Sequence, residues 1–369
     1  MSSHGREFTM SAMRNRREFV RALSGLAAGA AFAPTTSAFR QAPGTGRRQV
    51  TIAGRRVPVV DIHAHCGVST VAALVKGTPL AANANVPPAQ ILGPARIATM
   101  DAQGVDYQAL SINGFWWYGV TDRALADRVV RAQNEGLSAW CRAHPDRFVA
   151  FASSSLQFPD LAAAQLEDGI TRLGLRGAAI GGHVSGQDLS DARFDPFWAK
   201  AEALGALVFM HPAGAENIIR SGALGGRGDL GNIIGNPLET TYFLSRLIFD
   251  GVLDRFPALK VCGAHAGGYL PSYFGRTDVA CEVRPAAKCA NTKRPREYLR
   301  SQIFADTMAF SDEGLRHLVA EMGASQLVYG TDVPFNWPVT IDLVLKASFL
   351  TDADKTAILG GNLVKLLRI

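Results

Sequence analysis

Short apolar runs alternate with longer segments of helical periodicity along most of the chain. The apolar runs predict eight strands, at residues 57–65, 106–112, 148–155, 176–182, 206–211, 259–265, 303–307 and 327–331. Between them apolar residues recur at helical spacing, as in 122–144, 159–173, 195–204 and 238–256, and a last helix is predicted over 352–367. Gly174, Gly205 and Gly323 each follow a helical segment, where a left-handed cap is expected. Eight strand–helix units predict a closed (β/α)8 barrel of the α/β class.

Chain length allows either this barrel or two smaller domains, since about 330 residues remain after a short N-terminal segment. The barrel is the simpler interpretation, because the sequence shows no internal repeat and no second domain boundary. Two stretches interrupt the alternation, residues 69–94 after the first strand and 214–236 after the fifth. Loops of this length usually act as lids or binding loops, so we expect them to lie over the site and select the substrate.

The N-terminus has the order of an export signal. Residues 15–21 are basic and include the pair Arg16-Arg17, residues 22–33 are apolar, and small residues end at Ala38. This order predicts a twin-arginine signal peptide over 1–38, a linker over 39–56 and a barrel over 57–369, and hence a periplasmic protein. The alternative is a basic, disordered N-terminal tail, in which case the protein stays in the cytoplasm.

Charge and cysteine content exclude several classes of protein. Residues 1–38 hold five arginines and two glutamates, so their removal lowers the net charge from +6 to +3. No basic cluster remains to indicate a nucleic-acid partner, and no apolar run after the leader is long enough to span a membrane. The 5 cysteines have no regular spacing, which makes a disulfide framework unexpected. Cys66 and Cys262 lie in apolar strands and are expected to be buried.

Histidines and an aspartate stand at the predicted strand ends. His63 and His65 are two residues apart on a strand, so both side chains point to one face and can hold one ion. His211 ends the apolar run at 207–210, and Asp332 follows the last strand in the same manner, although a carboxylate there could also cap a turn. Barrel enzymes place their chemistry at the C-terminal ends of the strands, so these four residues predict a divalent-metal site.

His265, at the end of the sixth strand, has two possible roles. It could be a fifth ligand, or an acid/base group beside the metal. Four protein ligands already satisfy a mononuclear zinc-type site with one position open, so we favour the acid/base role. Asp332 is a second candidate for proton transfer. The fourth strand ends in Ile180-Gly181-Gly182-His183 with no lysine that could bridge two metals as a carbamate, which favours one ion.

Seven motifs resemble those of one protein family. They are DIHAHC, IGGHV, FMHPAG, GNPLETT, FDGVLDRFPALKV, AHAGGYLPSYFGRTD and YGTDVPF, and they run from about residue 57 to the end of the chain in the right order and spacing. This set resembles the amidohydrolase-2 branch of the amidohydrolase superfamily, and within it enzymes of the aminocarboxymuconate semialdehyde decarboxylase type. The resemblance implies a distorted (β/α)8 barrel of the metal-dependent hydrolase type.

The same resemblance assigns roles to individual residues. It implies one Zn²⁺, or Mn²⁺ in some aromatic acid decarboxylases, held by His63, His65, His211 and Asp332, with His265 as the catalytic histidine. It also matches Arg276 to an arginine that reaches the active site of a neighbouring subunit, and so implies a homodimer. Without the resemblance, Arg276 reads as an ordinary surface arginine.

Two features bear on the substrate. The semialdehyde decarboxylases carry an arginine for a substrate carboxylate in the loop after the first strand, whereas residues 69–94 here contain no arginine and one cation, Lys76. A smaller or singly charged carboxylic acid is therefore expected in place of a muconate with two carboxylates. Trp116 and Trp117 follow the second strand and could stack on a planar ring, or simply pack in the core.

Three functions remain open at this stage. The first is metal-dependent, non-oxidative decarboxylation of an aromatic or conjugated carboxylic acid, with His265 or Asp332 delivering the proton. The second is hydrolysis of an amide, ester or lactone by a metal-activated water. The third is a non-enzymatic metal- or ligand-binding protein of the periplasm, which the complete ligand set with a free base disfavours.

Overall fold

The computed structural model describes residues 46–215 and 217–369. The predicted signal peptide, 1–38, and the first part of the predicted linker, 39–45, lie outside the described residues. The rest of the linker forms an antiparallel hairpin of β1 (Thr51–Ile52) and β2 (Arg55–Arg56). Arg47 and Arg56 both form ion pairs with Asp106, so this part of the linker packs against the barrel.

All eight predicted strands are present in the predicted order. They are β3 (Val60–His65), β4 (Tyr107–Ser111), β5 (Phe148–Ala150), β6 (Gly177–Ile180), β9 (Leu207–Met210), β10 (Lys260–Gly263), β11 (Ile303–Asp306) and β12 (Leu327–Val328). Every pairing between neighbours is parallel. A short antiparallel hairpin, β7 (His183–Val184) and β8 (Gln187–Asp188), lies outside the ring.

The barrel consists of two arcs, β3–β4–β5 and β6–β9–β10–β11–β12. One isolated pairing, Ala152 with Ala178, joins β5 to β6, and another, Ala64 with Val333, joins β3 to the segment after β12. At the second seam the Ile62 amide donates to the Tyr329 carbonyl at 3.0 Å and the His65 amide to the Val333 carbonyl at 2.9 Å. The ring is therefore closed, but each seam pairs a single residue from either side, whereas each ladder within an arc pairs two to four residues.

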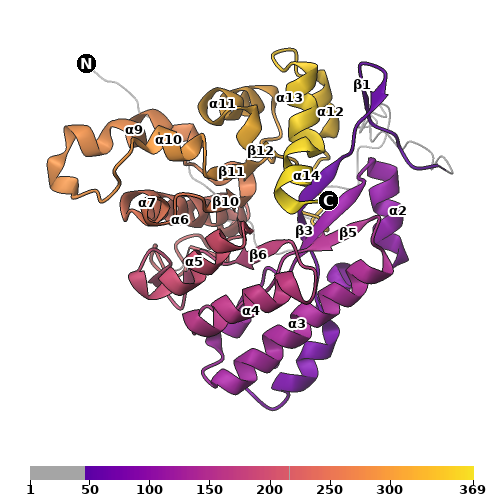
Figure 1. Cartoon of the computed structure of the whole chain (residues 1–369), viewed down its shortest axis with the longest axis vertical. Coiled ribbons are helices and arrows are strands. Elements are labelled where there is room, and N and C mark those ends of the chain that lie inside the picture. Colours follow the sequence, from indigo (N-terminus) through magenta and orange to yellow (C-terminus); the bar gives the residue numbers. More distant parts are fainter. Residues whose placement is uncertain (1–45, 216) are drawn as a thin grey trace, which may run out of the picture. The chain divides into compact units, whose positions relative to one another are not determined.

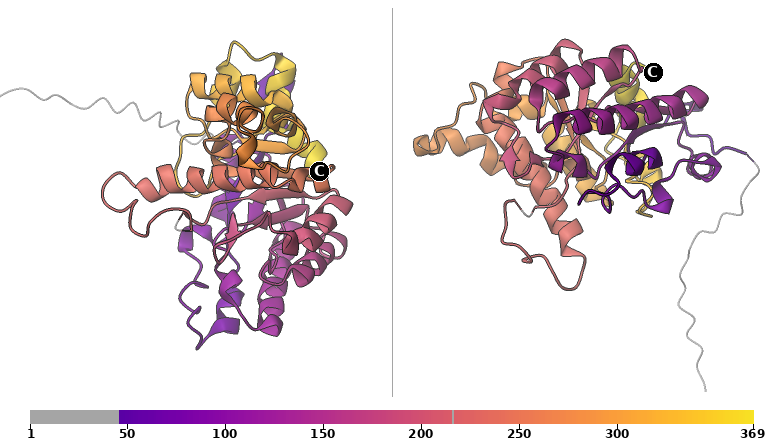
Figure 2. Two further views of the ribbon diagram at one scale, coloured as in Figure 1. Left: turned by 90° about the vertical axis from the view of Figure 1, so that its left-hand side faces the viewer. Right: turned by 90° about the horizontal axis from the view of Figure 1, so that it is seen from below.

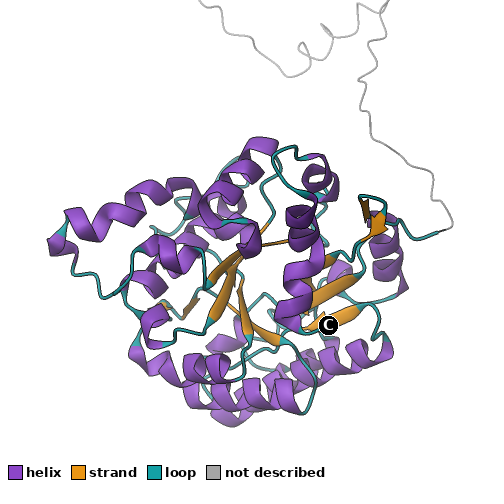
Figure 3. Ribbon diagram, turned by 45° about the horizontal axis from the view of Figure 1, so that its top comes forward, coloured by secondary structure: helices purple, strands orange, loops and turns teal. Residues whose placement is uncertain are grey.

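Helices surround the strands (Figures 1 and 3). They are α2 (Pro94–Gln103), α3 (Arg123–Ala143), α4 (Pro159–Thr171), α5 (Asp195–Ala203), α6 (Asn236–Phe249), α7 (Val252–Arg255), α8 (Ala264–Gly267), α9 (Phe274–Val283), α10 (Pro295–Leu299), α11 (Asp312–Met322), α12 (Ile341–Lys346), α13 (Asp352–Thr356) and α14 (Asn362–Leu367). The helix predicted over 238–256 is broken at Gly251, which has a φ of 69°. A π-helical turn, η9 (Ala357–Gly361), joins α13 to α14.

The hydrophobic core has two layers, as expected for a barrel. Alternate strand residues such as Ile62, Phe209 and Val328 form an inner cluster that fills the barrel, and Leu363 and Leu367 of α14 join it. The intervening strand residues pack outward against the helices in a larger cluster. Hydrophobic periodicity could predict these layers because strand side chains alternate strictly between the two faces.

The two long loops contain more regular structure than predicted. The loop after β3 includes the 3₁₀ helices η1 (Ser69–Val75) and η2 (Pro88–Gln90), and the loop after β9 ends in a π turn, η5 (Gly231–Gly235). The segment leading into α6 projects beyond the ring of helices (Figure 2). Over the described part of the chain, none of the helices combines the length and the hydropathy that crossing a membrane requires.

The cysteine prediction needs one correction. Cys281 and Cys289 form a disulfide at the end of α9, with a Cα–Cα distance of 5.9 Å. Sequence spacing could not reveal this pair, because only the turn between α9 and α10 brings the two residues together. Cys66 and Cys262 are buried and free, as expected.

Candidate metal centre

A β-bulge in β3 orients the two histidines of the DIHAHC motif. The pairing of β3 with β4 shifts register between Asp61 and Ala64. Val60 and Ile62 belong to the inner core cluster, whereas Ala64 packs in the outer one. The extra residue therefore reverses the alternation, so that His63 and His65 both face the inside of the barrel. The spacing of two predicted a shared face correctly, but the bulge determines which face it is.

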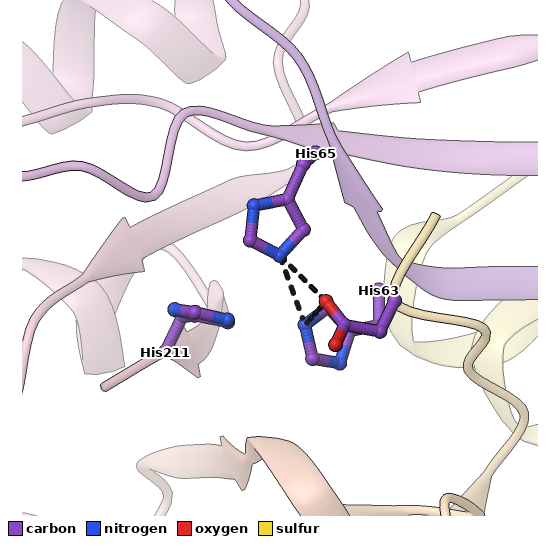
Figure 4. A group of neighbouring side chains, drawn as sticks. His63, His65 and His211 are labelled. Carbon is purple, nitrogen blue, oxygen red and sulfur yellow. Dashed lines mark hydrogen bonds and ion pairs between the residues drawn. The ribbon is translucent and has the colours of Figure 1, made fainter. Parts of the chain in front are cut away.

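The four predicted ligands converge at the C-terminal ends of β3, β9 and β12. One side-chain atom from each of His63, His65, His211 and Asp332 lies within 4.8 Å of the corresponding atom of the others. All four residues are buried. His63 and His65 come from β3, and the ring of His211 approaches them from the end of β9 (Figure 4). Three imidazoles and one carboxylate form the donor set of a divalent-metal site.

The hydrogen bonds around these rings fit a cation. His63 Nδ1 lies 2.8 Å from Asp306 Oδ2, and His211 Nδ1 lies 2.8 Å from the Pro212 carbonyl oxygen. Each Nδ1 therefore donates a hydrogen outward, which directs Nε2 of both rings toward the centre. His63 Nε2 lies 3.3 Å from His65 Nε2 and 3.1 Å from Asp332 Oδ1. Three acceptors this close together need a proton or a metal ion among them.

Electrostatics prepare the same atoms for an ion. Burial lowers the pKa of His65 to about 4 and that of His211 well below its usual value, so both rings are neutral at pH 7. Burial also opposes charge on His63, but Asp332 and Asp306 raise its pKa to about 10. Although burial opposes it, contacts with His63 and His265 lower the pKa of Asp332 below its usual range. The ionised carboxylate and the neutral rings of His65 and His211 are in the forms that bind metals, and a metal ion would replace the proton that the two carboxylates stabilise on His63.

His265 lies beside this cluster. Its Nε2 is 3.6 Å from Asp332 Oδ2, and its ring centroid is 5.3 Å from that of His211. Its Nδ1 is buried and has no hydrogen-bond partner among the described residues. The backbone φ is 54° at His265 and 58° at Asp332. Residues other than glycine rarely adopt this left-handed backbone conformation, and those that do are often found at functional sites.

Asp306, which sequence reasoning did not single out, anchors the centre. It ends β11 and faces the interior, two residues after Phe304 of the inner cluster. Besides accepting from the His63 ring, its carboxylate accepts from the backbone amides of His265 at 3.0 Å and Ala266 at 2.7 Å. One carboxylate thus fixes a predicted ligand and the backbone of the predicted catalytic histidine. The available signal was an aspartate at the end of an apolar strand, as at Asp332.

Two further buried carboxylates hold the loops around the centre. Asp61 accepts from the His63 amide at 3.0 Å and from the Thr331 hydroxyl at 2.7 Å, which ties β3 to the segment after β12. Glu239 of α6 accepts from the amides of Gly182, Ala213 and Gly214 at 3.1, 2.8 and 2.6 Å. It therefore fixes the chain directly after His211. Glu239 lies in the GNPLETT motif, and its position there was the signal for its role.

Gly330 allows the barrel to close around the ligands. A Cβ atom at this position would lie 2.9 Å from Asp306 Cβ and 3.1 Å from His63 Cβ, closer than side chains tolerate. The absence of a side chain lets β12 approach both residues. Gly330 precedes Thr331 and Asp332, so this close approach also positions the fourth predicted ligand.

The three predicted substrate-binding residues have different environments. Trp116 is partly buried and lines a cavity that also contacts His65. Trp117 is fully buried, and its Nε1 donates to the Ser154 carbonyl at 3.0 Å. Of the two alternatives for Trp117, stacking on a substrate or packing in the core, the burial of its ring favours packing. Arg276 is exposed on α9 and forms no hydrogen bond or ion pair with the described residues.

Comparison with known proteins agrees with this arrangement. A family model described as Amidohydrolase matches residues 60–369. The chain is 31% identical over 283 residues to a 2-amino-3-carboxymuconate-6-semialdehyde decarboxylase of Dictyostelium discoideum, covering 74% of this chain and 75% of that protein. It is 28% identical over 287 residues to a gamma-resorcylate decarboxylase of Rhodococcus jostii, covering 74% and 87%.

A solved structure shares the fold. The crystal structure of a dihydroxybenzoic acid decarboxylase from Polaromonas sp., with bound manganese and the inhibitor 2-nitroresorcinol, aligns with a TM-score of 0.71 at 24% identity. The alignment covers 85% of this chain and 97% of that one. The barrel, the four-residue donor set and the family match over residues 60–369 lead to one conclusion. The chain belongs to the amidohydrolase family.

Proposed function

We propose that the protein is a divalent-metal-dependent, non-oxidative decarboxylase of an aromatic carboxylic acid. The observation that carries the proposal is a set of three histidines and one aspartate whose ligand atoms lie within 4.8 Å of one another. His265 is a neighbour of this set but not a member of it. The decarboxylases to which the chain is 31% and 28% identical support the reaction class. Their substrates differ, so the class is supported more strongly than any particular acid.

His63, His65, His211 and Asp332 would hold the ion. When bound, the metal would supply a positive charge that holds the substrate carboxylate and draws electron density toward it. We propose Zn²⁺ or Mn²⁺, since three imidazoles suit zinc and manganese is bound in the Polaromonas structure. Because Asp306 keeps the hydrogen of His63 on Nδ1, the other nitrogen of that ring stays directed at the ion.

His265 is the proton carrier in this proposal. A proton passes from the His265 imidazole to the carbon of the substrate's aromatic ring that bears the carboxylate. The carbon–carbon bond to the carboxylate then breaks, its electron pair returns to the ring, and CO₂ leaves. The ring is placed for this transfer because Nε2 lies 3.6 Å from Asp332 Oδ2 in the centre, whereas Nδ1 is buried with no partner among the described residues.

Product analysis tests the reaction. The protein without residues 1–38 is loaded with Zn²⁺ or Mn²⁺ and incubated with hydroxylated aromatic acids, unsaturated acids, amides and lactones. Mass spectrometry then measures the masses of the products. Loss of the mass of CO₂ from an aromatic acid is expected. Gain of the mass of water would assign the site to hydrolysis instead. Protein stripped of metal is the control for both outcomes.

We further propose a homodimer that meets at α9. Tyr273 and Val283, at the two ends of this helix, are each 65% exposed, and Arg276 lies between them with no partner in the described chain. Exposed apolar side chains around an unpaired cation suit a surface that a second copy covers. Light scattering on the wild type and on Tyr273→Glu tests this, with a change from dimer to monomer expected.

Export by the twin-arginine route remains a proposal that rests on residues 15–38. The paired arginines, the apolar stretch and the small residues before position 39 support it. Fractionation of cells that express the full chain is the test, with N-terminal sequencing of the product. Mature protein in the periplasm is expected, and Arg16→Lys with Arg17→Lys should keep the protein in the cytoplasm.

A further inference from the structure

A cavity of about 330 Å³ adjoins the candidate metal centre. His65 forms part of its wall, and the ring of Phe335, 4.9 Å from that of His65, forms another part. The remaining walls come from η1, from the loop before η2, from the end of β4 and from α3. A volume of this size is typical of cavities that hold small ligands. The cavity is therefore placed to receive the part of a substrate that extends away from the ion.

The walls of this cavity are apolar or neutral. Val68, Val71, Val86 and Ile112 supply aliphatic surface, and Trp116 supplies an aromatic face. The described residues that line it include no lysine, arginine, aspartate or glutamate. Burial raises the pKa of Cys66 to about 12, so this thiol also stays uncharged. A second substrate carboxylate would enter the cavity without a counter-charge, which is costly in free energy.

Two buried amide side chains interrupt the apolar wall. Asn113 follows β4 and is 7% exposed, and Gln133 lies on α3 and is 2% exposed. Both Nδ2 and Oδ1 of Asn113, and Oε1 of Gln133, are buried without a hydrogen-bond partner among the described residues. Buried amide groups are nearly always paired, and an unpaired one destabilises the fold. Two such groups on the wall of one cavity indicate a ligand that pairs with them.

A comparison with a second cavity of the same volume supports this choice. That cavity, also about 330 Å³, lies between α2 and the segment after β12, and none of the five predicted metal-binding and catalytic residues lines it. Its charged wall residue, Arg96, already donates to the Gln108 side chain and to the His65 carbonyl. Gln103 Oε1 on that wall is also buried without a partner among the described residues, but of the two cavities the one beside His65 alone contacts the centre.

We propose that Asn113 and Gln133 determine substrate specificity by hydrogen-bonding to a neutral polar substituent, such as a hydroxyl, on the ring of a monocarboxylic aromatic acid. This inference rests on the proposed function for the position of the carboxylate at the metal centre. The ring lies between the apolar wall and Trp116. A hydroxyl group on the ring would accept a hydrogen bond from Nδ2 of Asn113 and donate its one hydrogen to Oε1 of Gln133.

Binding of isosteric ligand pairs tests the proposal. The ligands are 2-hydroxybenzoates that carry either a second hydroxyl or a methyl group at position 3, 4 or 5, and 2-hydroxybenzoate with a second carboxylate at the same positions. Their dissociation constants are measured by calorimetry on the metal-loaded wild type, Asn113→Leu and Gln133→Met. Asn85→Leu is the matched control, because Asn85 lines the same cavity but is exposed.

Wild type is expected to bind the hydroxyl member of one pair about tenfold more tightly than the methyl member, and the dicarboxylates most weakly. Asn113→Leu and Gln133→Met should each bring the hydroxyl-to-methyl ratio to within about twofold, and Asn85→Leu should preserve it. Equal binding of both members at all three positions in wild type overturns the proposal. A preference that survives in both variants also overturns it.

Thermal unfolding separates recognition from a structural role. Gln133→Met removes an unpaired buried polar atom at nearly constant volume, so its Tm should equal or exceed that of the wild type. A lower Tm with an unchanged binding ratio would mean that the amide supports the fold, which overturns the proposal.

The same ligands distinguish this inference from the proposed function. If no acid loses CO₂ but the hydroxyl preference exists and both variants remove it, the cavity assignment stands and decarboxylation fails. If CO₂ is released while the preference is insensitive to both variants, decarboxylation stands and the cavity assignment fails.

Discussion

The end of β3 and the end of β10 both present a histidine to the centre, but they hold it differently. The ring of His63 is fixed on both sides, by Asp306 at Nδ1 and by the predicted ligands around Nε2. The backbone amide of His265 also donates to Asp306, but its ring is held on one side only, by Asp332 Oδ2 at 3.6 Å from Nε2, while Nδ1 has no partner in the described chain. A ligand needs a constant tautomer, whereas a proton carrier needs a ring that can change its protonation state. The difference argues for two roles.

Removing the β10 ring should have the largest effect on turnover. His265→Ala is expected to lower kcat by about 10² to 10⁴-fold, because a positioned acid/base group contributes that much, while metal content stays near wild type. Steady-state kinetics together with metal analysis of the dialysed protein measure both quantities. His63→Ala is the matched comparison and should lose metal as well as activity. If His265→Ala also loses its metal, His265 is a fifth ligand and the distinction between the two strand ends fails.

Removing the charge of Asp306, which bonds both histidines, should disturb the ring of His63 on β3 more than His265 after β10, where it bonds only the backbone. Asp306→Asn keeps the size of the side chain but removes the charge that orients His63, so metal affinity should fall about 10 to 100-fold. Competition with a chelator of known affinity gives the dissociation constant. Asp312→Asn, on the exposed start of α11, is the control. Metal affinity within twofold of wild type would show that the His63 tautomer does not depend on Asp306.

A side chain placed at Gly330, between His63 on β3 and Asp306 on β11, should lower the folding stability. Gly330→Ala places a Cβ atom 2.9 Å from that of Asp306 and 3.1 Å from that of His63. The free energy of unfolding should fall by about 1 to 3 kcal/mol, as for other overpacked cores. Denaturant unfolding of metal-free protein measures it. Gly275→Ala is the control, since no atom lies within 4 Å of a Cβ there. Equal stability of the two variants would mean that β12 can move away at little cost.

The smallest effect is expected from the outer side of β3. Thr331→Val removes the hydroxyl that donates to Asp61 at 2.7 Å, so the free energy of unfolding should fall by about 1 kcal/mol. Thr331→Ser retains the hydroxyl and should stay close to wild type. Should both variants lose the same amount, the methyl group and not the hydrogen bond holds β3 against the segment after β12.

Local sequence patterns were sufficient to predict the barrel and the candidate ligands. Each strand is an apolar run bounded by turn residues, and each ligand ends such a run, so the barrel topology alone brings them together. His63, His65, His211 and Asp332 needed no knowledge of side-chain packing.

The supporting contacts could not be predicted in the same manner. The bulge in β3 depends on its register with β4, and the role of Asp306 depends on contacts 243 residues apart in sequence. Trp116 and Trp117 are adjacent and chemically identical, yet only tertiary packing places one at a cavity and the other in the core. Partners distant in sequence decide these features, and one chain carries no local signal for them.

The seam between β12 and β3 would give a bound metal ion a structural role in addition to its chemical one. Asp332 belongs to the five-stranded arc, whereas His63 and His65 belong to the three-stranded arc. A metal ion bound by all three residues would cross-link the two arcs at a seam where a single residue pair joins them. Chelators would then not only stop turnover but also weaken the contact between β3 and the segment after β12, because they remove this cross-link. Purification and storage with metal present would guard against that weakening.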